Sequence, residues 1–182
     1  MNKIIAIVGM CGSGKSIASD YYENRGYKKV YFGGVTMDQL KKEGLDVTPE
    51  NEKMMRERLR SEYGMAAYAI LSLPKIEEYA KTSNVVLDGL YSWDELVVLK
   101  EKFPDLKVIS IVVDKEIRYN RLAVREVRPF TFEEAKNRDI SEIENLAKGG
   151  PIAYADYFIL NNGGMDMYNN ELDRITKLIE GD

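Results

Sequence analysis

The chain has no histidine and only one cysteine among its 182 residues. Without an imidazole, histidine-based catalysis and zinc sites that contain histidine are excluded. A single cysteine cannot form an internal disulfide, so we expect a reducing, cytoplasmic environment. Tandem repeats, low-complexity tracts and linkers rich in glycine, proline and serine are also missing. We therefore expect one domain of ordinary size.

Long hydrophobic runs and a high charge of one sign are absent too. The apolar runs are short, as over residues 108–113, and none approaches the roughly 20 residues of a membrane span. The first residues lead directly into a motif, so we expect no signal peptide. A net charge of -4 argues against a nucleic-acid binder that relies on overall positive charge. We expect neither a membrane nor a nucleic acid as partner, and the oligomeric state stays open.

Short apolar runs alternate along the chain with segments of helical length. We predict strands at 4–8, 27–32, 85–87, 108–113 and 157–160, and helices near 14–25, 49–63, 64–81, 92–102, 115–127, 131–147 and 165–180. Strands separated by helices predict an α/β fold with a parallel sheet covered on both faces. Two long helical excursions, around 35–81 and 115–148, suggest small subdomains that overhang the strand ends.

The segment Gly-Met-Cys-Gly-Ser-Gly-Lys-Ser at 9–16 fits the phosphate-loop pattern G-x-x-x-x-G-K-[ST] at every fixed position, between a predicted strand and a predicted helix. Glycines let backbone N–H groups turn toward a β-phosphate, and the helix N-terminus adds positive potential. Lys15 would act on the β- and γ-phosphates, and the Ser16 hydroxyl would reach magnesium. We expect the nucleotide to contact Gly9, Cys11, Gly12, Ser13, Gly14, Lys15, Ser16 and Ile17.

Cys11, inside this loop, has two interpretations. A helix N-terminus can make a thiol reactive, which would give a redox-sensitive group. The alternative is a tolerated variable position of the loop, and we favour that interpretation.

Asp88 ends a predicted strand and precedes a glycine. At the carboxyl edge of a parallel sheet, beside the phosphate loop, its carboxylate can orient magnesium or a water bound to it. The alternative is an ordinary Asp-Gly turn. Because the chain also has a phosphate loop, we favour the magnesium role for Asp88.

With both motifs, the chain resembles the adenylate kinase and dephospho-CoA kinase group of P-loop kinases, in particular a branch of predicted nucleotide kinases. The likeness covers nearly the whole chain and includes the stretches 44–51, 87–92, 131–134 with 138–139, and 155–163. It implies a three-layer α/β/α P-loop NTPase fold with a parallel five-stranded sheet and one kinase domain over 1–182. That domain would have an acceptor-binding insert at 35–81 and a lid at 115–148. It also implies ATP and Mg²⁺ as cofactors, with Asn161 and Gly163 beside the donor adenine.

Four arginines are spaced by three, four and three residues, which would form one stripe on a helix; they are Arg118, Arg121, Arg125 and Arg128. A closing lid could bring such charge onto the transferred phosphoryl group and exclude water. A solvated helix face is the alternative. The resemblance places Arg125, Arg128 and Arg138 at lid positions, where we expect catalytic roles beside Lys15 and Asp88.

On the acceptor side, we expect Arg60, Gly33 and Tyr91 to bind the substrate. The resemblance gives Arg60 an acceptor-side position, and Gly33 lies in the stretch that leads into the insert. Tyr91 could stack on a base. A solvated helix face is the alternative for Arg60, and packing in the core or at the rim is the alternative for Tyr91. Related nucleotide kinases carry an aspartate and an arginine where this chain has Gly34 and Met37. The aspartates that dephospho-CoA kinases place after the second strand are absent as well.

The expected function is therefore ATP- and magnesium-dependent phosphoryl transfer to a small nucleotide-like acceptor, above all a nucleoside monophosphate. Transfer to a hydroxyl, as in dephospho-CoA kinase, is one alternative. The other is an ATP-binding regulatory protein, or a weak ATPase without an acceptor.

Overall fold

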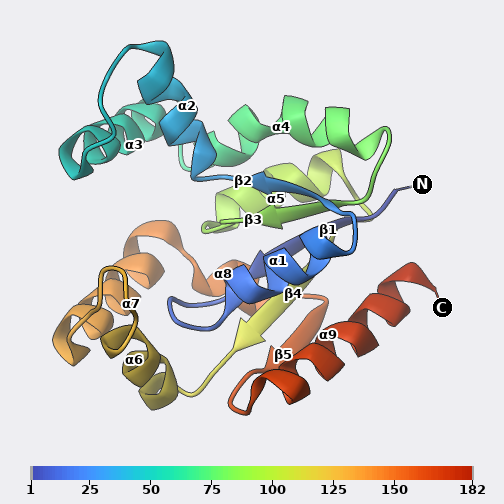
Figure 1. Ribbon diagram of the computed structural model, residues 1–182. Coiled ribbons are helices and arrows are strands. Elements are labelled where there is room, and N and C mark those ends of the chain that lie inside the picture. Colours follow the sequence, from blue (N-terminus) through green and yellow to red (C-terminus); the bar gives the residue numbers. More distant parts are fainter. Residues whose placement is uncertain (1, 182) are drawn as a thin grey trace.

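A parallel five-stranded sheet with helices on both faces forms the centre of the computed structural model, which describes residues 2–181 (Figure 1). The strands are β1 Ile4–Val8, β2 Lys28–Tyr31, β3 Val85–Asp88, β4 Lys107–Val112 and β5 Tyr157–Leu160. Their order in the sheet is β2-β3-β1-β4-β5, and every neighbouring pair is parallel. The predicted three-layer α/β/α architecture is confirmed.

The helices follow the predicted pattern with two additions. They are α1 Lys15–Asn24, α2 Gly34–Lys42, α3 Pro49–Tyr63, α4 Ala67–Ala80, α5 Trp93–Lys102, α6 Lys115–Ala123, α7 Phe132–Leu146, α8 Gly149–Ala153 and α9 Met165–Glu180. The sequence did not predict α2 and α8. Both begin at glycine, neither has a side-chain cap, and α8 contains a proline in its single short turn, so propensity gives little signal there. No helix within residues 2–181 is both long and apolar enough to cross a membrane.

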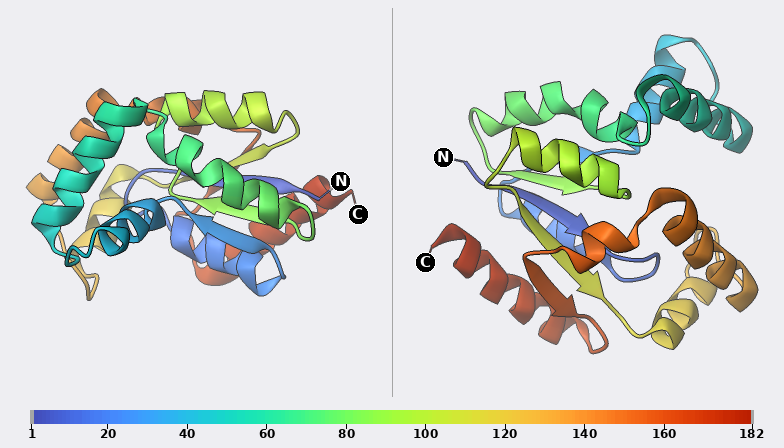
Figure 2. Two further views of the ribbon diagram at one scale, coloured as in Figure 1. Left: turned by 90° about the horizontal axis from the view of Figure 1, so that it is seen from above. Right: turned by 180° about the vertical axis from the view of Figure 1, so that it is seen from behind.

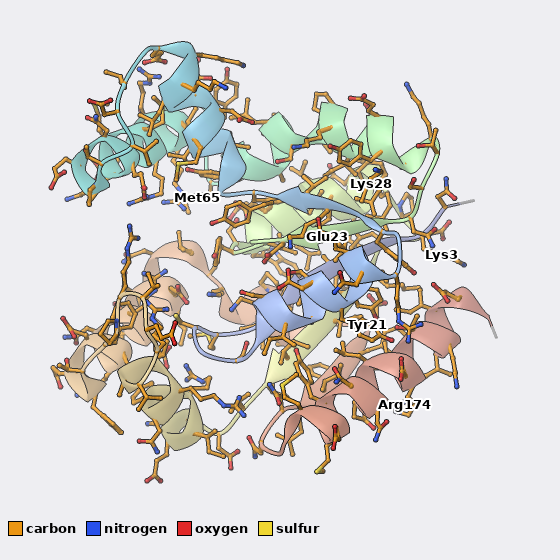
Figure 3. All side chains as sticks on the ribbon, in the orientation of Figure 1. Lys3, Tyr21, Glu23, Lys28, Met65 and Arg174 are labelled. Carbon is orange, nitrogen blue, oxygen red and sulfur yellow. The ribbon has the colours of Figure 1, made fainter. Side chains whose placement is uncertain are left out.

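The sheet separates two hydrophobic cores, and helices cover both of its faces (Figure 2). On β1, Ile5 and Ile7 enter the core beneath α1 and α9, whereas Ala6 and Val8 enter the core beneath α4 and α5. The central strand is buried on both faces, which is why it reads as a continuous apolar run. A hydrogen bond from Tyr21 on α1 to Asp173 on α9 joins the two helices of one layer (Figure 3).

Two groups of helices extend beyond the carboxyl ends of the strands. Helices α2 and α3 follow β2 on one side, and α6 and α7 follow β4 on the other (Figures 1 and 2). Side chains from both groups reach into the space between them (Figure 3). Of the predicted excursions, the α2 and α3 part of 35–81 and the α6 and α7 part of 115–148 overhang the same edge of the sheet, whereas α4 packs on the face of the sheet.

Helix α6 ends at Ala123, so the predicted stripe of four arginines on one helix is wrong. Two of the arginines stay on α6, and the other two fall in the loop that follows. Within this loop Arg128 has a left-handed backbone with a φ of 51°, and Pro129 after it disfavours helical geometry there. The loop turns back through a 3.0 Å hydrogen bond from the backbone N–H of Phe130 to the carbonyl of Leu122.

Candidate functional site

The phosphate loop connects β1 to α1 at the carboxyl end of the central strand. Gly9, Gly12 and Gly14 have φ values of 149°, 81° and 96°, which only glycine adopts without strain. A Cβ on Gly9 would lie 2.5 Å from the carbonyl oxygen of Ile111, and one on Gly14 would lie 2.7 Å from Asn161 Nδ2. The loop therefore needs glycine for both backbone conformation and space, as a cradle for phosphate does.

Lys15 is the first residue of α1, and its Nζ donates a 2.9 Å hydrogen bond to the Met10 carbonyl. Burial lowers the pKa of Lys15 to about 8, and the charge of Lys148 acts in the same direction, against the carboxylates of Glu142 and Asp88. An anion beside this ammonium would offset the cost of its burial. The position of Lys15 thus suits a phosphate better than it suits solvent.

Asp88 and the start of α1 are joined by a residue that sequence reasoning missed. Asp88 pairs with Ile7 across β3 and β1, which brings its carboxylate to the phosphate loop. Ser19 Oγ lies 3.1 Å from Asp88 Oδ2 and 2.9 Å from the Ser16 carbonyl. The available signal was the spacing of Ser19, one helical turn after Ser16. These hydroxyl and carboxylate oxygens fit the ligand preference of Mg²⁺.

The turn after β5 and the start of α9 hold the phosphate loop through hydrogen bonds to its backbone. Asn161 is buried, and its side-chain amide donates to the Ser13 carbonyl at 2.9 Å. Tyr168 of α9 donates to the Gly14 carbonyl at 2.9 Å, and Arg121 donates to the Asn161 carbonyl at 2.9 Å. The Asn161 amide is thus directed at the loop backbone, while Gly163 lies exposed in the same turn. The sequence did not predict that Tyr168 contacts the phosphate loop, because its helical spacing with the other buried residues of α9 predicts only a role in the core.

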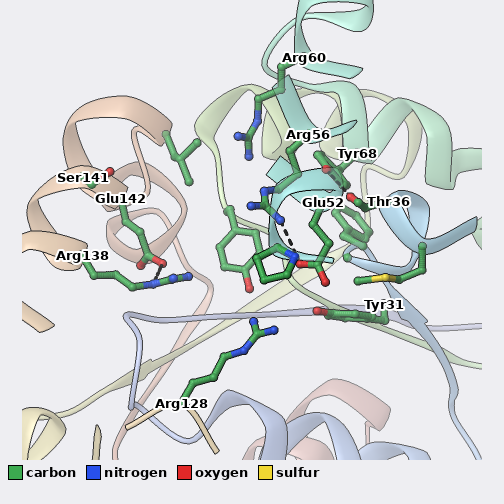
Figure 4. A pocket seen from close by; sticks show the side chains of 16 residues that line it. Tyr31, Thr36, Glu52, Arg56, Arg60, Tyr68, Arg128, Arg138, Ser141 and Glu142 are labelled. Carbon is green, nitrogen blue, oxygen red and sulfur yellow. Dashed lines mark hydrogen bonds and ion pairs between the residues drawn. The ribbon is translucent and has the colours of Figure 1, made fainter. Parts of the chain in front are cut away.

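A cavity of about 570 Å³ opens between the two overhanging groups of helices (Figure 4). Its walls bring together five residues that the sequence singled out: Gly33, Arg60, Tyr91, Arg128 and Arg138. Arg125 does not line it. Instead Arg125 donates from Nε to the Arg128 carbonyl at 2.5 Å, and its guanidinium lies 4.7 Å from the centroid of the Phe130 ring.

Tyr91 is positioned by the capping box at the start of α5. The buried Glu95 accepts hydrogen bonds from the backbone N–H groups of Tyr91 at 2.8 Å and Ser92 at 3.1 Å, and the Ser92 hydroxyl accepts from the Glu95 N–H at 3.1 Å. Burial raises the pKa of Glu95 to about 7, although these two N–H groups oppose the shift. The cavity wall at Tyr91 is therefore fixed by the helix cap rather than by the aromatic ring itself.

The cavity has a cationic part on α3. Arg56 pairs with Glu52 at 3.4 Å, whereas Arg60 has a buried Nε with no hydrogen-bond partner within residues 2–181. The Arg60 guanidinium lies 5.7 Å from the centroid of the Tyr68 ring. A buried donor without a partner is costly, so Arg60 has spare capacity to bind an anion.

Other lining residues of the cavity are aromatic and apolar. Tyr31 and Phe32 come from the end of β2, and Met37 comes from α2. Tyr68 also lines the cavity, and its hydroxyl shares a 2.7 Å hydrogen bond with that of Thr36. The lining therefore combines flat apolar surface with positive charge.

Arg118, the first arginine of the predicted stripe, is a buried structural residue. It makes a bidentate ion pair with Asp139, with N–O distances of 2.6 and 3.0 Å, and donates to the Cys11 carbonyl at 3.0 Å. The Tyr119 hydroxyl also donates to Asp139, at 3.1 Å. Cys11 itself packs against the small core formed by Tyr119, Leu122 and Ala135. Arg118 thus joins α6 and α7 to the phosphate loop and leaves no charge for the cavity.

Comparison with known proteins gives the family. The family model described as an AAA domain matches residues 5–144. A UPF0200 protein of Thermococcus kodakarensis is 36% identical over 177 residues, which cover 94% of this chain and 95% of the relative. A UPF0200 protein of Pyrococcus furiosus is 33% identical over 181 residues, which cover 97% of each chain.

Solved structures share the fold at low sequence identity. A shikimate kinase from Bacteroides thetaiotaomicron has a TM-score of 0.59 and 16% identity, with 98% of each chain covered. A gluconokinase from Sinorhizobium meliloti 1021 has the same TM-score and identity, with 98% of this chain and 94% of that chain covered. The fold is that of a P-loop kinase, and the relatives' names specify neither the adenylate kinase nor the dephospho-CoA kinase group. The chain belongs to the UPF0200 protein family, and its residues 5–144 form an AAA domain.

Proposed function

We propose that this protein transfers the γ-phosphoryl group of ATP, with magnesium, to a small nucleotide-like acceptor, most simply a nucleoside monophosphate. The observation that carries the proposal is the cavity between the two groups of helices, whose lining combines aromatic and apolar side chains with cations. One of these cations is Arg60, whose Nε has no hydrogen-bond partner within residues 2–181. A nucleoside monophosphate matches this lining, because its base has a flat apolar face and its phosphate is an anion. The P-loop kinase fold supports phosphoryl transfer in general.

On the donor side, the loop glycines, Ser13 and the N-terminus of α1 hold the phosphates, and Lys15 compensates the negative charge that moves during transfer. Ser16 and Asp88 would hold magnesium, with Asp88 acting directly or through a water. When bound, magnesium would neutralise negative charge on the phosphates. The donor base would lie near the turn with Asn161 and Gly163, and Ile17 would also contact the nucleotide.

On the acceptor side, Arg60 takes the role that an arginine at the start of the insert has in related nucleotide kinases. Gly34 and Met37 cannot bind a phosphate through side-chain charge, but Met37 can pack against an apolar group. Arg60 reaches the cavity from α3 instead. We infer an acceptor that differs from plain AMP.

Residues 35–81 and 115–148 would act as the acceptor-binding insert and the lid of the single domain 1–182. Both groups of helices line one cavity, and closure would bring Arg128 and Arg138 onto the phosphates and exclude water. Arg125 would support this segment by holding the Arg128 backbone.

A second candidate is transfer to a hydroxyl, which one observation favours. Asp88, at the cavity side of the phosphate loop, could accept the proton of an attacking hydroxyl, and it already receives a hydrogen bond from the Ser19 hydroxyl. A phosphate acceptor is ionised near neutral pH and needs no such base. An ATP-binding regulator without an acceptor is the remaining alternative.

One experiment separates the three. The protein is incubated with ATP, magnesium and a panel of nucleoside monophosphates and dephospho-CoA, and ADP formation is followed. A monophosphate that accelerates ADP formation supports the proposal, whereas acceleration by dephospho-CoA alone supports the hydroxyl acceptor. Slow ADP formation that no acceptor changes contradicts kinase activity and supports the regulatory role.

A further inference from the structure

Lys148 is a fully buried lysine that neither the donor nor the acceptor site described above uses. It precedes α8, and only 1% of its surface is exposed. Its Nζ donates to Glu142 Oε2 at 2.5 Å and lies 4.6 Å from the centroid of the Tyr91 ring. Burial lowers the pKa of Lys148, and the charge of Glu142 opposes that shift. A buried ammonium persists only with such a partner.

Glu142 is shared between two cations. It is buried on α7, its Oε2 accepts from Lys148, and its Oε1 accepts from Arg138 Nε at 3.0 Å. The Arg138 side chain remains 48% exposed and lines the cavity (Figure 4). Only Nε of Arg138 bonds to a partner within residues 2–181, which leaves its two terminal nitrogens for phosphate oxygens. The three residues form a chain that runs from the buried interior to the cavity.

Lys148 is fixed to the sheet side of the molecule, whereas its partners belong to the overhanging helix. The backbone N–H of Lys148 donates to the Glu142 carbonyl at 3.2 Å, and Ala147 between them has a left-handed φ of 49°. Helix α8, which follows directly, contacts β4 and α5. The ion pair therefore closes the C-terminal end of α7, and α8 joins that end to the core.

The charges of the same group also act on Lys15 of the phosphate loop. The charge of Lys148 lowers the pKa of Lys15, and that of Glu142 raises it. A carboxylate near the γ-phosphate would repel it unless its charge is matched. Lys148 and Arg138 together supply that match.

We propose that Lys148 is a positioning residue for phosphoryl transfer, which acts through Glu142 to hold Arg138 at the edge of the cavity. The inference rests on the proposed kinase function. Lys148 touches no substrate in this arrangement. It fixes the Glu142 carboxylate, so that Arg138 keeps one nitrogen on Glu142 and presents the others to the transferred group. Its contact with Tyr91 steadies the adjoining wall of the cavity.

A double-mutant cycle tests the inference. ADP formation from Mg·ATP is measured with the best acceptor of the panel for wild type, Lys148→Met, Arg138→Ala and the double variant. We expect Lys148→Met to lower kcat about tenfold or more, with the KM for ATP changed less than about threefold. We expect the double variant to be no slower than Arg138→Ala, because the two residues act in series. A wild-type kcat in Lys148→Met, or losses that multiply in the double variant, would overturn the inference.

Controls separate folding from function. Lys102→Met removes a lysine that makes a 2.7 Å ion pair with Glu77 on the surface, and it should match wild type. If circular dichroism shows that Lys148→Met is unfolded, Glu142→Gln replaces it in the cycle with the same two outcomes. Lys15→Ala distinguishes the two levels of the argument. If Lys15→Ala turns over like wild type, the proposed function fails; if only Lys148→Met does, the positioning role alone fails.

Discussion

Arg60→Ala is the sharpest perturbation of the proposed acceptor site, because its effects on stability and on substrate binding should separate. In the free protein Arg60 Nε has no hydrogen-bond partner among the described residues, and the Arg60 guanidinium lies 5.7 Å from the centroid of the Tyr68 ring. A cation–π contact contributes about 0.5–1 kcal/mol. The free energy of unfolding should therefore fall by no more than about 1 kcal/mol.

Binding should respond far more strongly. A hydrogen bond to a charged group contributes about 1.5–3 kcal/mol, and a loss of that size raises the KM for the acceptor about 10- to 150-fold. Lysine keeps the charge but not the bidentate geometry of arginine, so the KM of Arg60→Lys for the acceptor should lie between those of wild type and Arg60→Ala. The KM for ATP should stay unchanged in both variants, since Arg60 lies on the acceptor side of the cavity.

Initial rates of ADP formation, measured at saturating Mg·ATP with varied monophosphate, check this prediction. Arg58→Ala is the matched control, because Arg58 lies on the same helix, pairs with Glu43 and does not line the cavity. The reasoning is refuted if a phosphorylated acceptor has the same KM in wild type and Arg60→Ala. It is refuted equally if Arg58→Ala raises that KM as much as Arg60→Ala does.

Five further outcomes follow from the site. Lys15→Met should reduce ADP formation about 100-fold or more, because the transferred group loses a fixed charge; a folded variant with normal turnover would contradict the donor site. The pKa of Lys15 is lowered to about 8 in the fold, below its ordinary 10.5, so the unfolded chain binds more protons between these values. The contribution of Lys15 to stability should therefore rise with pH from about 8 to about 10.5, so denaturant titrations should show the free energy of unfolding of wild type gaining on that of Lys15→Met over this range. EDTA should abolish turnover and added magnesium restore it; turnover that survives EDTA would exclude the role of Ser16 and Asp88. Amide exchange in 115–148, and less strongly in 35–81, should slow when a bisubstrate ligand binds, and equal exchange would argue against closure. AMP should be a weak acceptor at best, because Gly34 and Met37 replace the expected aspartate and arginine; efficient phosphorylation of AMP would refute that specificity.

Local pattern was enough for the parts of the site that lie within one segment. The phosphate loop, with its strand and helix, is a contiguous motif, and its glycines are required by backbone conformation. Asp88 was predictable because a parallel sheet brings the carboxyl ends of neighbouring strands together, as the pairing of Ile7 with Asp88 shows. The order of strands and helices likewise determined the fold class.

Spacing along the chain misled where the backbone left its helix. The arginine stripe required α6 to continue past Ala123, and the left-handed Arg128 before Pro129 prevents this. Arg118 on the same helix then lies buried against Asp139 rather than in the cavity. Periodicity places side chains on one face of a helix, but it does not predict whether that face packs against another element or is exposed to water.

The sequence by itself determined the sheet, the phosphate loop and the acidic residue beside it, because these depend on hydrophobic pattern, glycine conformation and strand order. Only the tertiary structure decided how charge is distributed around the cavity. Arg60 Nε has no hydrogen-bond partner among residues 2–181, Arg118 is neutralised by Asp139, and Lys148 is linked to Arg138 through Glu142. These pairings depend on distances between segments far apart in the chain and on burial, which strengthens electrostatic interactions by excluding water.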